Sequence, residues 1–309
     1  MINLKDLVWV EKYRPRNVKD VIGLHSDKLK KYLENISELP HFLLYSRSPG
    51  TGKTSTALSI INDLGCDSLI LNSSDDRKIE TIREKVNVFS KLQSSKVGIK
   101  RCIFLDEIDG TLKPSQNALR NIMETYSKNC FFILTCNNIE KVIEPIRSRC
   151  VAFDLSSPPK ALIRSYLLNI CDKESIDAND ASVQKTIDRF YPDIRTMVQF
   201  LQTVKVENKT LVQATEECFD KYEKCLKLIL NKKFISIKDM VFSGDLNPKE
   251  FNGWLFKNIF KHTKSIGTEK VKKIIYILAD NELAFSYGSS EDIIFLANTL
   301  KIIDILKGA

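Results

Sequence analysis

The sequence is poor in histidine and has no closely spaced pair of cysteines. Only three histidines occur, and none of the eight cysteines stands in C-x-x-C spacing, which disfavours a structural zinc site. Several cysteines lie in apolar runs such as CIFLDE and FFILTC, where they are typical of small buried core residues. Buried free thiols indicate a reducing compartment, so we expect the protein in the cytoplasm.

Long apolar runs and targeting segments are also missing. No window approaches the ~18 consecutive apolar residues of a membrane-spanning helix. Acidic residues interrupt the N-terminal stretch MINLKDLVWVEKYRPR, which argues against a signal or transit peptide. No tract is low in complexity, and 43% hydrophobic with 28% charged residues indicates folded domains. With 309 residues, the chain is long enough for two or three domains.

The charge balance is basic, and the two basic residue types are distributed unequally. The formal net charge of +8 favours a polyanionic partner, although a lysine-rich soluble surface gives the same value. Arginine ends at Arg195, whereas lysine continues to the end of the chain. Because the arginine fork suits fixed recognition of phosphate and carboxylate, ligand binding is expected in the first 195 residues and packing or assembly beyond them. Codon bias would produce the same lysine excess.

Strand-like and helix-like segments alternate in the first half of the chain. The strand-like runs are HFLLYS, SLILN, RCIFLDE and CFFILTC, at residues 41–46, 68–72, 101–107 and 130–136. Segments with helical spacing of apolar residues separate these runs, which predicts a parallel sheet covered on both faces. Strand signals fade after FDLSSPPK (153–160), where Pro158 and Pro159 indicate a linker, and the remaining chain is predicted to be helical.

The stretch SRSPGTGKTS (46–55) is similar to the phosphate-binding loop G-x-x-x-x-G-K-[ST] between a strand and a helix. Backbone N–H groups there can cradle phosphates, Lys53 adds a positive charge and Thr54 can place its hydroxyl on magnesium. Arg47 stands where the first glycine is usual, but that position only opens the loop. The alternative is a glycine-rich turn that happens to contain GKT. The predicted nucleotide-binding residues of the loop are Gly50, Thr51, Gly52, Lys53, Thr54 and Ser55.

Polar residues end two of the other predicted strands. Asp106 and Glu107 follow CIFL about fifty residues after the loop. In proteins with a phosphate-binding loop, an aspartate at the end of a strand holds magnesium, and a neighbouring carboxylate can polarise the attacking water. Asn137, after FFILTC, could place its amide between the γ-phosphate and that water. Taken singly, each is also compatible with an acidic strand end or a turn asparagine. No NKxD-type guanine signal is present, which favours ATP over GTP.

Arg149 lies in EPIRSRC, shortly after the last predicted strand. Its loop is expected on the far side of the sheet from the phosphates bound by its own chain. From there an arginine can act as a finger only on the nucleotide of a neighbouring subunit. The alternative is a surface arginine in a salt bridge.

Six segments carry a family resemblance, and they are WVEKYRP (9–15), SPGTGKT (48–54), FLDEID (104–109), CNN (136–138), EPIRSRC (144–150) and PDIRTMVQFLQ (192–202). In this order and spacing they resemble the ATPase subunits of sliding-clamp loaders, the replication factor C small subunit group within the AAA+ ATPases. The resemblance is strong to about Thr203 and rests on length and helicity beyond it. The missing loop glycine and the short chain make the sequence most similar to the clamp-loader large subunit of T-even-like bacteriophages.

The resemblance implies an α/β fold with three domains. These are an AAA+ nucleotide-binding domain with a parallel sheet (1–155), a helical lid (156–208) and an α-helical collar for oligomerisation (209–309). It also implies ATP and Mg²⁺ as cofactors, with a sliding clamp, primer–template DNA and other clamp-loader subunits as partners. If the protein comes from a phage, its compartment is the cytoplasm of the infected host.

The resemblance further assigns roles to residues outside the phosphate loop. The adenine would be lined by Val10, Glu11, Lys12, Tyr13 and Ile22. Trp9 and Tyr13 are equally compatible with N-terminal core anchors.

Asp106 and Glu107 would be the Walker B pair and Asn137 the first sensor, with Arg149 as the trans-acting finger. Arg195 would be the second sensor, on the lid, where the family usually reads GDMR and this chain reads PDIR.

Four residues on helices complete the implied roles. Lys78 and Arg83 would face the DNA, and Lys78 would also restrain Glu107 until DNA arrives; a solvated helix face is the alternative. Gln116 and Arg120, on the helix after the Walker B strand, would relay the nucleotide state between subunits.

The sequence therefore predicts an ATP-driven switch that opens a ring-shaped clamp and loads it onto primer–template DNA. A helicase loader, a branch-migration motor or another AAA+ remodeller would share the loop, the Walker B pair and the finger, but not WVEKYRP or the SRC context. A nucleotide-binding scaffold without turnover is the alternative from another class of protein. Asp106, Glu107 and Asn137 argue against that scaffold.

Overall fold

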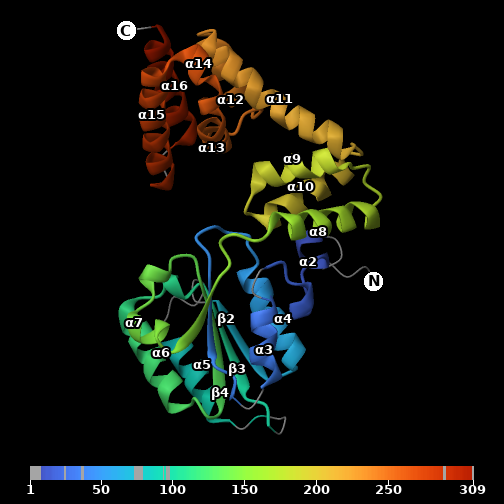
Figure 1. The fold of residues 1–309 in the computed structure, drawn as a ribbon. Coiled ribbons are helices and arrows are strands. Elements are labelled where there is room, and N and C mark those ends of the chain that lie inside the picture. Colours follow the sequence, from blue (N-terminus) through green and yellow to red (C-terminus); the bar gives the residue numbers. More distant parts are fainter. Residues whose placement is uncertain are drawn as a thin grey trace. The chain divides into compact units, whose positions relative to one another are not determined.

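This computed structural model describes residues 8–23, 26–35, 38–72, 79–92, 94, 98–287 and 290–307. The chain divides into two compact units, Met1–Leu211 and Val212–Ala309 (Figure 1). Within the described part of the chain, no helix has the length and apolar character needed to cross a lipid bilayer.

A five-stranded parallel sheet with the order β2-β3-β4-β1-β5 forms the centre of the first unit. Its strands are β1 (His41–Tyr45), β2 (Ser68–Asn72), β3 (Arg101–Asp106), β4 (Cys130–Cys136) and β5 (Cys150–Asp154). All four observed pairings are parallel, which confirms the predicted sheet. The edge strand β5 was not predicted, whereas the other edge strand, β2, was, although each has just one buried residue.

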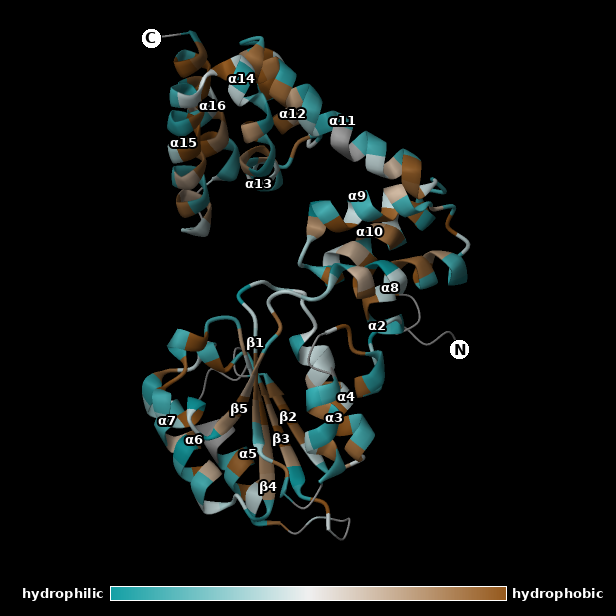
Figure 2. Cartoon of the chain, viewed as in Figure 1, coloured by the Kyte–Doolittle hydropathy of each residue, from teal (hydrophilic) through white to brown (hydrophobic). Residues whose placement is uncertain are grey.

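Helices cover both faces of this sheet (Figure 1). The helical segments of the first unit are α2 (Trp9–Lys12), η1 (Val18–Asp20), α3 (Ser26–Glu34), α4 (Lys53–Leu64), α5 (Ile79–Lys91), η3 (Ile108–Gly110), α6 (Lys113–Thr125), η4 (Ile139–Lys141), α7 (Glu144–Arg147), α8 (Lys160–Lys173), α9 (Asp180–Phe190) and α10 (Ile194–Val206). Phe42 and Phe104 point into the core beneath α3 and α4, whereas their neighbours Leu43 and Ile103 point into the core beneath α5 and α6. This alternation follows from the two-residue period of a strand. Figure 2 shows the resulting concentration of hydrophobic residues on the strands.

The helices α8, α9 and α10 follow Pro158 and Pro159 and belong to the first unit. We refer to these three helices as the lid. Side-chain caps mark the starts of two of them. Asn179 accepts a hydrogen bond from the Ser182 N–H at the start of α9, and Asp193 accepts one from the Thr196 N–H at the start of α10. The cap of α10 matters for the site, because α10 starts against the phosphate loop.

Within the described residues of the second unit, the regular elements are all helical. Its elements are α11 (Leu211–Leu230), α12 (Phe234–Phe242), α13 (Pro248–Asn258), η5 (Ile259–His262), α14 (Thr263–Ile266), α15 (Thr268–Ser286) and α16 (Glu291–Lys307). They pack around an apolar core that includes Phe251 and Phe295. Buried Asn252, Asn281 and Asn298 hydrogen-bond in a chain across α13, α15 and α16, with N···O distances of 3.0 and 2.6 Å. Since burying an amide without a partner is costly, this chain favours one register of the three helices.

Candidate functional site

The loop between β1 and α4 has the backbone of a phosphate-binding nest. Gly50 and Gly52 both have positive φ, at 68° and 97°, a conformation that glycine adopts without the Cβ penalty. Gly52 is the residue immediately before α4, so N–H groups at the start of this helix point into the loop. The hydroxyl oxygen of Thr51 is buried and makes no hydrogen bond within the described residues. An unpartnered polar atom at this position fits a group whose partner is a bound ligand.

Arg47 does not line the pocket, and its side chain is exposed to solvent. The residues on either side of it brace the loop instead. The Ser46 hydroxyl donates to the Ser48 carbonyl at 3.0 Å and accepts from the Ser48 N–H at 3.3 Å. The loop therefore keeps these internal hydrogen bonds although Arg47 replaces the usual first glycine.

Lys53 lies across the concave side of the loop. Its ammonium donates to the carbonyls of Ser46 and Ser48 at 3.3 and 3.0 Å. Burial lowers the pKa of this lysine from its ordinary value, and Arg195 acts in the same direction, whereas Asp106 and Asp109 raise it. A negatively charged ligand in the loop would therefore stabilise the charged form of Lys53.

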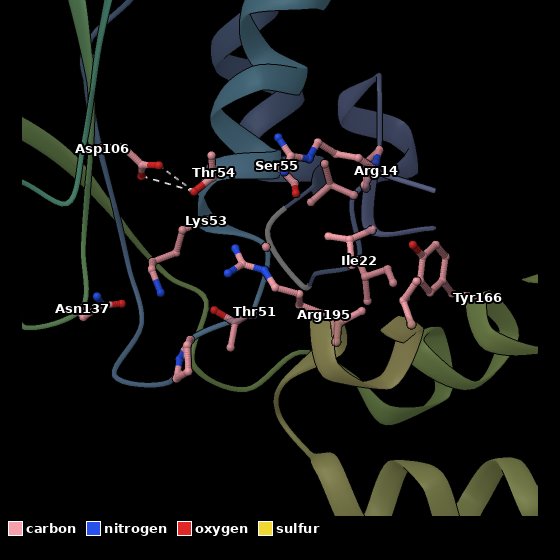
Figure 3. Close-up of a pocket in the computed structure, with 18 of the residues that line it drawn as sticks. Arg14, Ile22, Thr51, Lys53, Thr54, Ser55, Asp106, Asn137, Tyr166 and Arg195 are labelled. Carbon is pink, nitrogen blue, oxygen red and sulfur yellow. Dashed lines mark hydrogen bonds between the residues drawn. The ribbon is translucent and has the colours of Figure 1, made fainter. Parts of the chain in front are cut away.

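Thr54 and Asp106 form an all-oxygen pair at the ends of α4 and β3 (Figure 3). The Thr54 hydroxyl lies 3.0 and 3.2 Å from the two carboxylate oxygens of Asp106. The Thr135 hydroxyl also donates to Asp106, which fixes the orientation of the carboxylate. Two cis ligands of an octahedral Mg²⁺, each about 2.1 Å from the ion, are about 3.0 Å apart, so this pair fits that ion.

The described residues contain no cluster of three or more His, Cys, Asp or Glu side chains that could hold a metal alone. Magnesium commonly binds through one carboxylate, with phosphate and water oxygens completing its shell. The observed donor set matches that mode of binding rather than a metal cage made by the protein alone.

Glu107 has an unusual backbone conformation. Four non-glycine residues have positive φ among the described residues, and Ser175, Asn208 and Lys232 each follow the end of a helix. Glu107 instead follows β3 directly, with φ 57° and ψ 47°, and its N–H donates to the Thr135 hydroxyl at 2.9 Å. Its exposed side chain contributes to the pocket. Strain of this kind away from a helix end is typical of functional sites.

Asn137 follows the C-terminal end of β4 and lines the same pocket. The Asp109 carboxylate accepts hydrogen bonds from the N–H groups of Asn137 and Asn138 at 3.1 and 2.9 Å. This contact fixes the backbone where Asn137 enters the pocket.

The lid contacts the phosphate loop directly. The N–H groups of Ile194 and Arg195, at the start of α10, donate to the Gly50 carbonyl at 3.0 and 3.4 Å. The carboxylate of Asp193 lies against Gly50, so a Cβ on this glycine would lie 1.7 Å from Asp193 Oδ1. The Arg195 side chain enters the pocket between its two sides (Figure 3).

We expect Gly50→Ala to weaken nucleotide binding more than tenfold. A methyl group would collide with Asp193, and the positive φ costs a non-glycine residue about 1–2 kcal/mol. Isothermal titration with ADP measures the change. Gly253→Ala, in helix α13 and with nothing within 4 Å of its Cβ, is the matched control. An unchanged ADP affinity in Gly50→Ala would contradict this account of the loop.

The other side of the pocket is largely apolar. Figure 3 shows Ile22 and Tyr166 on the opposite side of the view from Asp106 and Asn137. Several lining residues were not predicted from the sequence, and these are Arg14, Pro15, Val21, Pro49, Tyr166, Ile194 and Val198. Arg14 and Pro15 belong to WVEKYRP, so that motif was a usable signal for them. No local pattern marks Tyr166 or Val198, because folding of the lid brings them to the loop.

Only two of the five residues assigned to the adenine, Val10 and Ile22, line the pocket. Glu11, Lys12 and Tyr13 are not among the lining residues, and the polar partners of their side chains are Arg14 and Glu174. Glu11 pairs with Arg14 at 2.5 Å, and Lys12 and Tyr13 both donate to Glu174 at the end of α8.

The contact with Glu174 perturbs Tyr13. Burial raises the pKa of the Tyr13 phenol, and Glu174 raises it further through its hydrogen bond and negative charge. The side chains of Lys12 and Tyr13 therefore contribute to the junction with the lid rather than to the pocket wall.

Arg149 lies away from the pocket, immediately before β5. Since His41 at the start of β1 pairs with Cys150, Arg149 lies at the amino edge of the sheet, opposite the edge that carries the phosphate loop. Its guanidinium contacts Glu124 of α6 at 2.6 Å and the Pro145 carbonyl at 2.7 Å.

The remaining assigned residues are Lys78, Arg83, Gln116 and Arg120, of which Arg83 belongs to α5 and the last two to α6. Lys78 and the side chain of Arg83 fall outside the described residues. Gln116 is buried and joins α6 to the segment after β4, through hydrogen bonds with the Ile143 N–H and the Lys141 carbonyl. Arg120 lies 3.7 Å from the same Glu124 that contacts Arg149.

Comparison with known proteins shows which families this chain is similar to. Residues 42–155 match the family model of the ATPase family associated with various cellular activities (AAA). The replication factor C small subunit of Methanococcus maripaludis is 34% identical over 300 residues, covering 92% of this chain and 95% of that protein. The replication factor C small subunit of Saccharolobus solfataricus is 28% identical, covering 94% of this chain and 92% of that protein.

Solved structures add a likeness of fold. The RuvB Holliday junction branch migration motor of Thermotoga maritima is 18% identical, with a TM-score of 0.54, and the match covers 74% of this chain and 85% of that chain. The predicted AAA+ fold with a helical C-terminal region is thereby confirmed. The chain is an ATPase and belongs to the replication factor C small subunit family.

Proposed function

We propose that this chain binds ATP with Mg²⁺ and is an ATPase subunit of a sliding-clamp loader. The main support is that one pocket gathers the phosphate loop, the two carboxylates at the end of β3, Asn137 and the lid residue Arg195, in a chain whose relatives include replication factor C small subunits. ATP binding and DNA-stimulated hydrolysis would drive the opening of the clamp and its loading onto primer–template DNA.

Each side of the pocket has its own part in the proposed reaction. The N–H groups of residues 50–54 would bind the phosphates, and Lys53 would exchange its carbonyl partners for phosphate oxygens. Thr54 and Asp106 would hold Mg²⁺, which neutralises charge on the phosphates. Val10 and Ile22 would contact the adenine.

Hydrolysis requires a positioned water next to the γ-phosphate. Glu107 would orient and polarise this water, and Asn137 would hold it against the phosphate. Arg195 would contact the phosphates from the lid. Since the start of α10 is bonded to the Gly50 carbonyl, a change at the loop would also move the lid.

Arg149 would complete the site of a neighbouring subunit. It lies at the amino edge of the sheet, about one strand length from the loop of its own chain, so it cannot reach its own nucleotide. Its ion pair with Glu124 is partly exposed on both partners, and pairs of this kind contribute about 0–1 kcal/mol, so releasing the finger costs little. Loss of the γ-phosphate would then loosen the contact between subunits.

The larger assembly belongs to the same proposal. Residues 1–155 would be the nucleotide-binding domain, 156–208 the lid and 209–309 an oligomerisation collar. Lys78 and Arg83 would contact the DNA backbone without reading its sequence. We also propose a cytoplasmic location. The similarity to the clamp-loader large subunit of T-even-like phages stays a prediction, in which case the cytoplasm is that of the infected host.

The rate of ATP hydrolysis by the assembled loader tests this function. We expect primed DNA together with a sliding clamp to raise the rate well above that of the protein alone. The DNA-stimulated part should fall steeply between ~50 and ~200 mM salt, because each neutralised phosphate releases counterions. A rate that is the same with and without DNA and clamp would contradict clamp loading.

A further inference from the structure

Residues 8–18 form a segment, which we call the strap, whose first half is attached to the lid. The Trp9 N–H donates to Gln202 Oε1 of α10 at 3.1 Å, and the Trp9 ring is buried. The Tyr166 hydroxyl of α8 donates to the Tyr13 carbonyl at 2.9 Å. The first half of the strap is therefore hydrogen-bonded to two lid helices, α8 and α10, through residues that come more than 150 positions later in the chain.

The second half of the strap is attached to α4, the helix that follows the phosphate loop. Three hydrogen bonds make this attachment: Ser59 Oγ to the Pro15 carbonyl (3.1 Å), Asn62 Nδ2 to the Arg16 carbonyl (2.9 Å) and the Val18 N–H to Asp63 Oδ2 (2.9 Å). The strap thus joins the helix that starts at Lys53 to the lid that carries Arg195.

Glu174 makes the polar contact at the lid end of the strap. One oxygen of this carboxylate accepts hydrogen bonds from both the Lys12 ammonium and the Tyr13 hydroxyl, the latter at 2.5 Å. The Glu174 side chain is 15% exposed, and the Lys12 side chain is 38% exposed. Glu174 itself is not a lining residue of the pocket.

The strap also forms one wall of the pocket. Val10, Arg14 and Pro15 line the pocket, whereas Lys12 and Tyr13 bind Glu174. The lid meets the core a second time where α10 bonds to the Gly50 carbonyl. The width of the pocket between the phosphate loop and the strap therefore depends on two contacts of the lid. One is the contact of Glu174 with the strap, and the other is the bonding of α10 to the Gly50 carbonyl.

We infer that Glu174 is a positioning residue for nucleotide binding: by holding Lys12 and Tyr13, it fixes the strap wall of the pocket relative to the lid. This inference rests on the proposed binding of an adenine nucleotide. The wall contacts the part of the ligand that ATP and ADP share, because the phosphate-binding residues lie on the other side (Figure 3). Loosening the strap should weaken both nucleotides equally and spare the hydrolytic step.

Nucleotide titrations and turnover on the assembled loader provide the first measurement. We expect Glu174→Ala to raise the Kd for ADP and the KM for ATP by about 3- to 10-fold each, the loss of roughly one hydrogen bond, with kcat changed less than about twofold. Arg164→Gln is the matched control, since its ion pair with Asp180 at 2.9 Å joins two lid helices without touching the strap. A merely structural role would instead lower kcat and thermal stability together.

Restoring the pair with reversed charges gives the second measurement. Lys12→Glu and Glu174→Lys should each weaken ADP binding, and the double variant should recover most of the affinity. Hydrogen–deuterium exchange without nucleotide should be faster at residues 9–13 in Glu174→Ala, with exchange in α4 unchanged. Wild-type ADP affinity in Glu174→Ala, or a double variant no better than the single ones, would overturn the inference. A wild-type protein that binds no ADP would instead overturn the proposed function, and this inference with it.

Discussion

Replacing Glu107 by glutamine should lower the kcat for ATP hydrolysis about 10²- to 10⁴-fold, the range attributed to a positioned general base. Glutamine has the shape of glutamate but cannot take up a proton from water at neutral pH. The Glu107 backbone is held by the Thr135 hydroxyl, which contacts the Asp106 carboxylate as well. The isosteric change leaves this framework in place, so the Kd for ATP should change little.

Single-turnover hydrolysis and equilibrium ATP binding, measured on the same assembled protein, separate the two effects. Glu34→Gln makes the same chemical change on the exposed surface of α3 and should behave as the wild type. Asp106→Asn should differ from Glu107→Gln, because it removes a proposed magnesium ligand and therefore weakens Mg-dependent ATP binding. Turnover at the wild-type rate in Glu107→Gln would remove Glu107 from the chemical step.

The central strands of the sheet were the most readily predicted. The runs that became β1, β3 and β4 lie in the middle of the sheet, where burial on both faces makes a strand uniformly apolar. The two edge strands, β2 and β5, each have a single buried residue, and only β2 was predicted, from the run SLILN. Edge position, which depends on the whole topology, cannot be inferred from five residues.

The site shows the same division between local and tertiary information. The residues of the phosphate loop and those that end β3 and β4 follow their strands directly in the chain, so local pattern was enough to bring them together. The opposite wall comes from the strap and the lid, whose approach depends on contacts such as that of Tyr166 with Tyr13. Resemblance alone assigned Lys12 and Tyr13 to the adenine, and it did not foresee that Glu174 would engage both side chains.

Replacing Arg149 by alanine should leave ATP binding intact and lower turnover in the assembly by about 10³- to 10⁵-fold, as for arginine fingers elsewhere. Arg149 lies at the sheet edge opposite the phosphate loop and is not part of the pocket of its own chain. Its loss should therefore affect only hydrolysis at the junction with the next subunit. Arg147→Ala, two residues earlier at the end of α7 and paired with Glu144 at 3.0 Å, is the control for removing a neighbouring arginine.

Mixing two inactive variants distinguishes an action between subunits from one within a chain. Lys53→Ala removes the phosphate grip but keeps the finger, whereas Arg149→Ala keeps the grip but removes the finger. In an assembly of equal amounts, about a quarter of the interfaces join an intact loop to an intact finger by random assortment, because each interface is heterologous. We expect each variant alone to be inactive and the mixture to recover measurable turnover. If the mixture is as inactive as each variant alone, Arg149 does not act across the interface. In that case, an intact loop in one subunit would not be completed by an intact Arg149 in its neighbour.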